Sequence, residues 1–242
     1  MPENSDTFQS RPRRGPPEPE PVDLDVLFED DCLVVVNKPA GMVVHPTYKN
    51  WSGTVLNGLL WRVRDRTGLL PGIVTRLDKD TSGLVIAALR PDVHARIQKD
   101  NAARRVIKEY LALVHGTPFP AAGSIALPLA RSVDDRRRVV VTPGGQTSET
   151  RYEVVSSCDG RSVVRCELLT GRTHQIRVHL AASGWPVVGD AVYGDGHADI
   201  ARQALHAWRV RMPHPLTRIA MEFEAAPPED LRDLITRARE PA

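Results

Sequence analysis

A polar loop between two apolar segments, at residues 72–87, constrains this chain more than any other stretch. Gly72-Ile73-Val74 leads into the loop after Pro71, and Leu84-Val85-Ile86-Ala87 leads out of it. Short apolar, β-branched runs bounded by Gly and Pro are typical of strands. The stretch therefore predicts a strand, a loop and a second strand. The loop then lies at the edge of a rigid sheet, where folds commonly place their chemistry.

The loop itself fits several chemistries in part. Asp78, Asp80, Ser82 and Gly83 match the first half of a calcium-binding loop, but its twelfth position requires Glu and is Leu89. A phosphatase-type aspartate nucleophile lacks the helix–strand alternation of a parallel sheet around it. A glycosidase pair needs two carboxyls that face each other across a sugar. We interpret Asp80 as a residue that shapes the turn by accepting backbone N–H bonds, and Asp78 as the chemical carboxylate.

The rest of the chain predicts many antiparallel strands with a few helices. Asp159-Gly160 between two apolar runs is a strong hairpin signal, and Thr54 is a candidate N-cap. Strands are expected near 26–28, 32–36, 104–114, 152–156, 162–168, 206–212 and 219–224, short strands within 123–153 with a hairpin tip at 134–138, and helices near 54–61, 92–101 and 230–239. The predicted fold class is α+β, with a mixed, largely antiparallel central sheet flanked by helices around a central cleft.

A second polar segment, at residues 168–180, combines arginines, histidines and threonines with an apolar side formed by Ile176, Val178 and Leu180. A zinc site would need histidines at i and i+4 with an acidic partner, whereas His174 and His179 are five apart. We therefore expect no metal here. Arg177 is the residue of interest, because a cation beside a buried aspartate keeps that carboxylate ionised and nucleophilic.

The bulk composition is that of an ordinary soluble protein. Of the 242 residues, 41% are hydrophobic and 26% are charged, and the net charge of +2 does not by itself indicate a nucleic-acid binder. Three cysteines without a C-x-x-C pair argue against a disulfide framework and favour a cytoplasmic setting. No apolar run approaches the roughly 20 residues that span a bilayer, so no membrane association is expected.

Four ordered motifs, covering residues 26 to about 230, make the sequence resemble the RluA-type family of RNA pseudouridine synthases. The segment 75–84 is similar to the family signature H-R-L-D-x-x-[ST]-[ST]-G-L. The other three matches are Asn37 to Pro46, Lys108 to Gly116, and Leu168 to Gly194 with its Gly-Arg-Thr-His-Gln-Ile-Arg and Gly-Asp-Ala-Val-Tyr-Gly runs. The resemblance implies the pseudouridine synthase catalytic fold and isomerisation of uridine in RNA without a cofactor.

The resemblance also implies roles for single residues. Asp78 matches the catalytic carboxylate, which acts at the ribose C1′ so that the N1–C1′ bond breaks and uracil rejoins through C5. Tyr110 matches the tyrosine that packs on the target base, and Arg177 matches the cation that pairs with the aspartate. Candidate RNA-binding residues are Arg76, Lys38, Arg172, His174 and Thr75. A base inside a duplex must be flipped out first, at a cost of roughly a few kcal/mol.

This sequence departs from the family pattern in two respects. Thr75 stands where the family most often has His, which puts in doubt any role of that His in orienting RNA. The stretch before the first motif is too short for the S4 RNA-binding domain that many relatives carry. We therefore expect a catalytic domain at residues 22–240, without an S4 domain, behind a disordered Pro- and Arg-containing tail at residues 1–21.

Two further functions remain open from the sequence, besides the enzyme. One is a catalytically silent RNA-binding or ribosome-assembly factor on the same scaffold, and the other is a glycoside hydrolase acting on nucleosides. The Asp78, Tyr110 and Arg177 set favours the synthase. The expected partner is RNA, with ribosomal RNA of the large subunit favoured over transfer RNA, and we expect a monomer.

Overall fold

One ten-stranded sheet organises the molecule. The computed structural model describes residues 15–194, 196 and 199–238. The strands of the large sheet are β1 (Val26–Glu29), β2 (Leu33–Lys38), β3 (Gly72–Ile73), β4 (Ser82–Ala88), β5 (Ile107–His115), β6 (Ala122–Ile125), β9 (Thr150–Cys158), β10 (Arg161–Leu168), β11 (Leu205–Pro213) and β12 (Ala220–Glu224). A separate two-stranded sheet holds β7 (Leu129–Arg131) and β8 (Val139–Val141). The helices are α1 (Val55–Val63), α2 (Pro91–Ala102), α3 (Gln175–Ala182) and α4 (Glu229–Arg237).

The strand order runs β1-β2-β4-β11-β5-β10-β9-β6, with β3 paired to β4 and β12 paired to β11. Strand pairs within the described residues are antiparallel except for β4 and β11, which run parallel. This architecture confirms the predicted α+β class with its largely antiparallel sheet. No helix in the described part of the chain is both long and apolar enough to cross a membrane.

The predicted tight turn, helix N-cap and hairpin tip are also confirmed. Asp159 and Gly160 both adopt positive φ, 51° and 70°, as the tight turn between β9 and β10 requires. The Thr54 hydroxyl accepts a hydrogen bond from the backbone N–H of Asn57 and caps α1. The basic run at 134–138 lies in the loop that joins β7 to β8, as expected of a hairpin tip.

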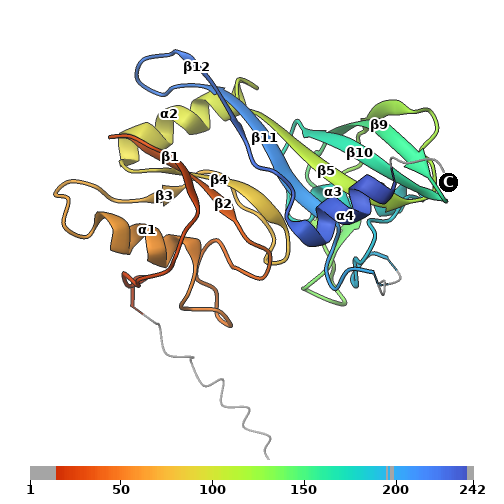
Figure 1. Cartoon of the computed structure of the whole chain (residues 1–242), viewed down its shortest axis with the longest axis horizontal. Coiled ribbons are helices and arrows are strands. Elements are labelled where there is room, and N and C mark those ends of the chain that lie inside the picture. Colours follow the sequence, from red (N-terminus) through yellow and green to blue (C-terminus); the bar gives the residue numbers. More distant parts are fainter. Residues whose placement is uncertain (1–14, 195, 197–198, 239–242) are drawn as a thin grey trace, which may run out of the picture.

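The first half of the sheet is covered on both faces, which explains its continuous apolar runs. On one face, alternate residues of β2 and β4 such as Val35 and Ile86 pack with Ile97 of α2. On the other face, their neighbours Val34 and Val85 pack with α1. Figure 1 shows α2 above these strands and α1 below them. The helices therefore hold β4 rigid between two cores.

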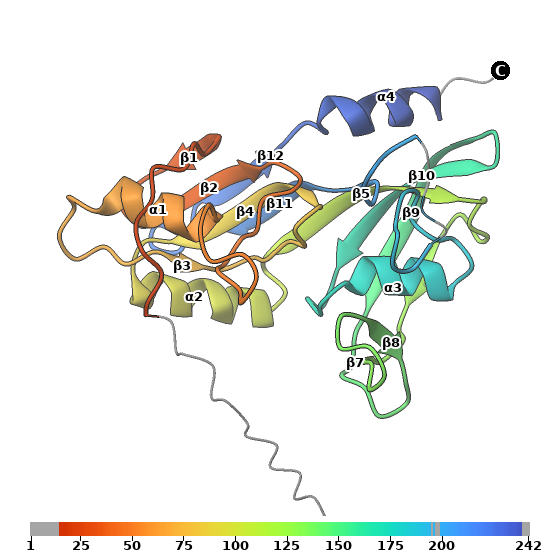
Figure 2. The same ribbon diagram turned by 90° about the horizontal axis from the view of Figure 1, so that it is seen from below.

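The second half of the sheet, β5, β10 and β9, has its own pair of covering helices. Figure 2 shows α4 on one side of these strands and α3 on the other, with the β7–β8 hairpin beyond α3. Ile176 and Leu180, four residues apart on α3, belong to the core that β5 and β10 form with α4. Val178 packs instead with Leu129 and Val139 of the hairpin. The apolar residues of the 168–180 segment therefore lie on helix α3 and pack against two different parts of the protein, the sheet core and the β7–β8 hairpin.

The two halves meet where β4 runs beside β11. Ser82 pairs with His206 and Gly83 with Ala207, at the start of β4. Gly83 has φ +109°, and a Cβ atom added to it lies 2.2 Å from the Ala207 carbonyl oxygen. The preceding loop, residues 74–81, is thereby delivered to the middle of the sheet rather than to an outer edge.

The segment at residues 15–21 runs along the start of α1. The Glu20 carboxylate accepts from the Gly53 backbone N–H at 2.7 Å, and Asn57 Nδ2 donates to the Glu18 carbonyl at 2.8 Å. The expected tail of residues 1–21 therefore contains a hydrogen-bonded portion at Glu18–Glu20, and its residues 1–14 lie outside the described residues.

The contact at Gly83 leads to a stability prediction. We expect Gly83→Ala to lower the free energy of unfolding by roughly 3 kcal/mol, because the new methyl group forces β4 and β11 apart at a strained φ. Urea unfolding checks the value. Gly144→Ala is the matched control, because a Cβ at Gly144 meets nothing within 4 Å. Equal stability of the two variants would contradict the close approach.

Candidate active site

The loop that carries Asp78 is fixed to its surroundings through its backbone. The Thr81 N–H donates to the Asp78 carbonyl at 3.1 Å, which closes a tight turn. Lys38 Nζ donates to the carbonyl of Lys79 at 2.9 Å, and Arg202 Nη1 donates to that of Asp80 at 3.2 Å. The loop is thus held at three successive positions, and the carboxylate of Asp78 is left to project from it.

Arg177 from α3 meets this carboxylate across the junction of the two halves. Arg177 Nη1 donates to Asp78 Oδ2 at 2.7 Å. The Nε and Nη2 atoms of the same guanidinium donate to the two oxygens of Asp190, at 2.6 and 2.8 Å. The Arg177 side chain is 5% exposed and that of Asp190 1%, whereas that of Asp78 is 23% exposed. One carboxylate is therefore buried as a fixed partner, and the other faces the open side.

Arg177 and Asp190 stabilise each other's charges. Burial alone lowers the pKa of Arg177, but the hydrogen bonds that it donates to Asp190 and the charge of Asp78 outweigh this effect and raise the pKa. Burial raises the pKa of Asp190, but the Arg177 pair outweighs that effect and lowers it. Arg177 and Asp190 are consequently both charged in the folded protein.

Asp190 is a site residue that the sequence reasoning did not single out. Besides Arg177 it accepts the backbone N–H groups of Val192 and Tyr193, at 2.9 and 3.1 Å. These bonds explain the local pattern Gly189-Asp190-Ala191-Val192-Tyr193-Gly194, in which the aspartate side chain folds its own loop. The sequence did contain this aspartate inside the Gly-Asp-Ala-Val-Tyr-Gly motif, but its partner Arg177 lies thirteen residues away.

His174 and Tyr193 form the wall beside Arg177 and its two carboxylate partners. Tyr193 Oη accepts from the Val139 N–H at 2.8 Å and lies 2.8 Å from His174 Nδ1. Donation of the phenol proton to Nδ1 leaves the ring proton on Nε2, which is 3.8 Å from Asp78 Oδ1. Burial, aided by the charge of Arg177, lowers the pKa of His174, so the ring is neutral near pH 7.

Tyr110 lies on β5 and lines the same small hollow as Asp78 and Arg177. Burial, together with the charge of Asp78, raises the pKa of its phenol, which keeps the hydroxyl protonated. The aromatic ring is 7% exposed and belongs to the core at its inner side. Its position is therefore set by sheet packing.

The hollow has a volume of about 50 Å³, close to the share of two water molecules in the liquid. Arg76 and Arg172 are exposed and lie at its rim, and His174 also lines it. Arg172 Nε donates to the carbonyl of Thr147 at 3.2 Å. Six of the eight predicted site residues thus converge on one place, from three widely separated segments.

Lys38 does not belong to an RNA-contacting surface, which corrects the sequence-based assignment. The residue is 1% exposed, and its Nζ donates to the carbonyls of Pro39, Met42 and Lys79 at 2.8, 2.8 and 2.9 Å. Its three N–H groups are all used inside the protein. Sequence reasoning treated the lysine as a surface cation because burial cannot be read from a Lys-Pro pair.

The side chain of Thr75 also makes a contact within the protein. Its hydroxyl oxygen accepts the Ile86 backbone N–H at 2.9 Å, so it ties the loop to β4. The structure thus supplies a reason for a β-branched hydroxyl residue at this position, separate from the RNA contact expected from the sequence.

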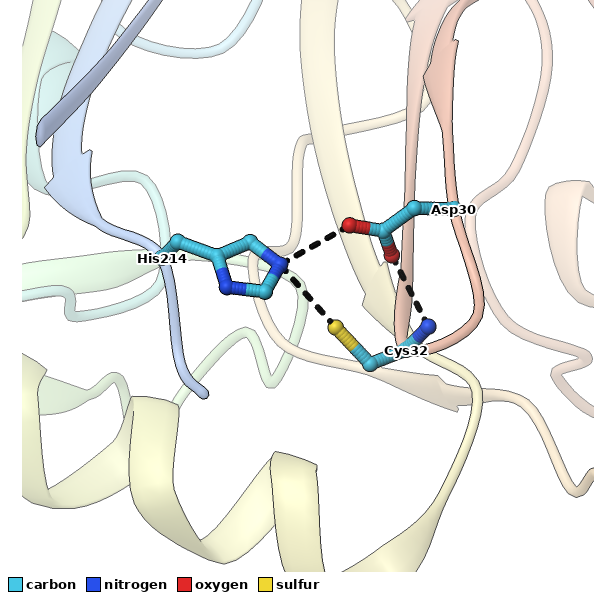
Figure 3. A group of neighbouring side chains, drawn as sticks. All are labelled: Asp30, Cys32 and His214. Carbon is cyan, nitrogen blue, oxygen red and sulfur yellow. Dashed lines mark hydrogen bonds and ion pairs between the residues drawn. The ribbon is translucent and has the colours of Figure 1, made fainter. Parts of the chain in front are cut away.

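A group of metal-ligand type lies away from this site, in Asp30, Cys32 and His214 (Figure 3). His214 Nδ1 accepts the backbone N–H groups of Leu216 and Thr217, so the ring proton is on Nε2. That Nε2 donates to Asp30 Oδ2 at 2.8 Å and lies 3.3 Å from Cys32 Sγ. Burial and the Asp30 carboxylate raise the pKa of the thiol to about 12. We interpret the group as a latch between the β1–β2 turn and the β11–β12 loop, because a metal on Nε2 would displace a proton already in use.

Comparisons with known proteins point in one direction. Residues 32–182 match a family model described as RNA pseudouridylate synthase. A Bacillus subtilis protein named uncharacterized RNA pseudouridine synthase YlyB is 42% identical over 225 residues, which cover 91% of this chain and 74% of that protein. A Zymomonas mobilis protein named ribosomal large subunit pseudouridine synthase D is 38% identical, with the same two coverages.

Solved structures agree with the sequence relatives. Human RNA pseudouridylate synthase domain containing 1 superposes with a TM-score of 0.70 at 28% identity, over 86% of this chain and 85% of that one. Human RNA pseudouridylate synthase domain containing 4, at 24% identity, shares the fold with a TM-score of 0.71.

The buried lysine generates a prediction about pH. Burial lowers the pKa of Lys38 from 10.5 to about 7, so the unfolded chain binds more protons than the folded one between these values. Stability therefore rises with pH in that window. We expect the free energy of unfolding, relative to Lys38→Met, to increase by on the order of 2 kcal/mol between pH 7 and 9 in urea titrations. If the free energies of unfolding of both proteins change equally between pH 7 and 9, the prediction is wrong.

Proposed function

The chain belongs to the RluA-type family of RNA pseudouridine synthases, and from this premise we propose that it modifies a uridine in ribosomal RNA of the large subunit. Several relatives that match about nine-tenths of the chain carry the name ribosomal large subunit pseudouridine synthase D, which supports this RNA. The observation that carries the chemistry is the 2.7 Å pair of Asp78 and Arg177 at the base of a hollow lined by Tyr110.

In the proposed reaction, Asp78 acts on the ribose of the flipped nucleotide. Its carboxylate either attacks C1′ or removes a sugar proton, and the electrons of the N1–C1′ bond pass to N1 of uracil. The uracil turns and C5 bonds to C1′, while the Asp78–C1′ bond breaks or the abstracted sugar proton returns. C5 then loses its proton to solvent and N1 gains one, so no atom is added or lost overall. Either route uses the carboxylate of Asp78, which accepts a hydrogen bond from Arg177 Nη1 at 2.7 Å.

Tyr110 is proposed to support the base and to move no proton in its resting state. A ring that lies against the sheet core offers a fixed face for stacking, which binds bases by roughly 1–3 kcal/mol each. Its raised pKa keeps the phenol neutral, so the hydroxyl can donate a hydrogen bond to an oxygen of uracil.

The RNA is proposed to lie across the rim that Arg76 and Arg172 form. A nucleotide is larger than the hollow, so these exposed side chains move aside as the base enters. The β7–β8 hairpin continues this surface with Arg131, which borders Arg172 in a second depression, and with Arg138, whose guanidinium lies 5.6 Å from the Tyr193 ring. Arginines arranged in this way suit phosphate contacts.

The proposal includes a monomeric catalytic domain at residues 22–240 that acts in the cytoplasm. One continuous sheet joins the described parts of that range, which supports a single domain. The buried cysteines Cys32 and Cys166 form no disulfide bond, which supports a reducing compartment.

Pseudouridine mapping in cells tests the proposed substrate. We expect deletion of the gene to remove pseudouridine at one or a few positions of large-subunit ribosomal RNA, detected by carbodiimide labelling. Complementation with Asp78→Asn should leave those positions unmodified, because the amide cannot act as the nucleophile or base. Asp80→Asn is the matched control and should restore them. Loss of sites only in transfer RNA would redirect the proposal to that substrate.

Substitution of the tyrosine tests the stacking role. We expect Tyr110→Phe to keep the affinity for RNA within about twofold in filter-binding titrations, because the ring face is preserved. Tyr110→Ala removes the face and should weaken binding of the flipped base by roughly 1–3 kcal/mol. A large loss of affinity in the phenylalanine variant would count against stacking and in favour of the hydroxyl as the binding group.

A further inference from the structure

The segment at residues 202–206 holds the far side of the catalytic loop. Arg202 donates to the carbonyl of Asp80, and Gln203 Nε2 lies 3.1 Å from the Thr81 hydroxyl. His206 Nδ1 lies 2.9 Å from the Ser82 hydroxyl. Burial lowers the pKa of His206 to about 4, so the ring is neutral and Nδ1 accepts the serine proton. The last two loop residues and the first residue of β4 are therefore bound by one short segment that leads into β11.

Arg202 extends this arrangement to the last helix. Its Nε and Nη2 atoms donate to both oxygens of Asp230 on α4, at 2.7 and 2.8 Å. The arginine side chain is 8% exposed, whereas that of Asp230 is 47% exposed. Burial of a guanidinium is costly without a paired carboxylate, so Asp230 keeps Arg202 in this position.

We propose that Arg202 is a positioning residue of the active site, and that Asp230 orients it from α4. The inference rests on the proposed role of Asp78. The Nη1 atom that remains after the bidentate pair is the one that binds the Asp80 carbonyl. Arg202 does not line the hollow, so it acts on the reaction only through the backbone of the loop.

The backbone path from Arg202 to Asp78 is short. The carbonyls of Lys79 and Asp80 are bound by two different buried side chains, Lys38 from β2 and Arg202 from the segment before β11. Both carbonyls belong to the turn that presents Asp78, so their donors hold that turn in place. Loss of one anchor lets the turn rotate and lengthens the 2.7 Å contact to Arg177. A misplacement of about 1 Å costs on the order of a hundredfold in rate.

Lysine cannot replace this arginine. The planar guanidinium makes two contacts to Asp230 and one each to the carbonyls of Asp80 and Gln203, whereas an ammonium group is a point charge on a flexible stem. Arg202→Lys therefore keeps the charge and breaks the geometry. Asp230→Asn changes the half-exposed partner instead and leaves the buried arginine in place. The two variants weaken the same anchor from opposite ends.

The experiment compares these variants on large-subunit ribosomal RNA purified from cells that lack the gene. We expect Arg202→Lys and Asp230→Asn to lower the single-turnover rate at saturating protein by on the order of tenfold or more. The Kd for RNA in filter binding should stay within about twofold, because neither residue reaches the RNA-binding rim. Asp230→Glu, which retains two acceptor oxygens, should recover most of the rate.

A structural readout accompanies the rate. Hydrogen exchange of the peptide covering residues 75–84 should become faster in Arg202→Lys and Asp230→Asn, since the turn loses an anchor. Arg218→Lys is the matched control, because Arg218 forms the same bidentate pair with Asp100 far along the chain, at 2.7 and 3.0 Å. It should leave both the rate and the exchange of this peptide unchanged.

The results separate positioning from general stability. A rate loss in Arg202→Lys no greater than in Arg218→Lys, or unchanged exchange at residues 75–84, would overturn the proposal. If the unaltered protein does not modify this RNA, the choice of RNA is wrong, and the exchange of the loop still decides whether Arg202 positions it. Normal rates with Asp230→Asn would remove α4 from the argument.

Discussion

The guanidinium of Arg177 is the group on which the site depends. It faces two carboxylates, and they have different exposures: Asp190 is buried and takes two of its hydrogen bonds, while Asp78 is partly open and takes one. In the proposed reaction Asp78 loses its charge, and a buried cation with no other partner would then be costly. Asp190 removes that cost throughout the reaction. The arrangement therefore lets the carboxylate change state without destabilising the protein around it.

This pair can form only because the sheet brings two halves of the chain together. Asp78 precedes β4 in the first half and Arg177 lies on α3 in the second, ninety-nine residues further on. The parallel contact of β4 with β11, made close by Gly83, fixes the distance between them. Each half is packed on both faces, so neither can shift without disturbing a core. The rigidity that positions Asp78 thus comes from ordinary strand and helix packing.

The sequence predicted what local chemistry determines. Asp159-Gly160 required a tight turn, Thr54 capped a helix, and the polar loop between apolar runs marked Asp78, each from residues close together in the chain. The residue type alone could not predict the burial of Lys38, because the sequence does not distinguish a solvated lysine from one bound to three carbonyls. Asp190 and the Arg202–Asp230 pair were missed since their partners lie thirteen to more than a hundred residues away. Such contacts appear only when the topology is known.

Buried charge around the catalytic loop follows from its position in the sheet. The loop lies at the centre of the sheet, and the protein supplies donors for its carbonyls at Lys79 and Asp80. Neutral side chains offer one or two hydrogens, whereas Lys38 and Arg202 offer several and donate to the carbonyls of residues 79 and 80. Each cation then needs compensation, which the nearby carboxylates and carbonyls provide at a net cost in folding free energy. The loop is held in place by interactions that contribute little to stability, which is consistent with selection for the geometry of Asp78.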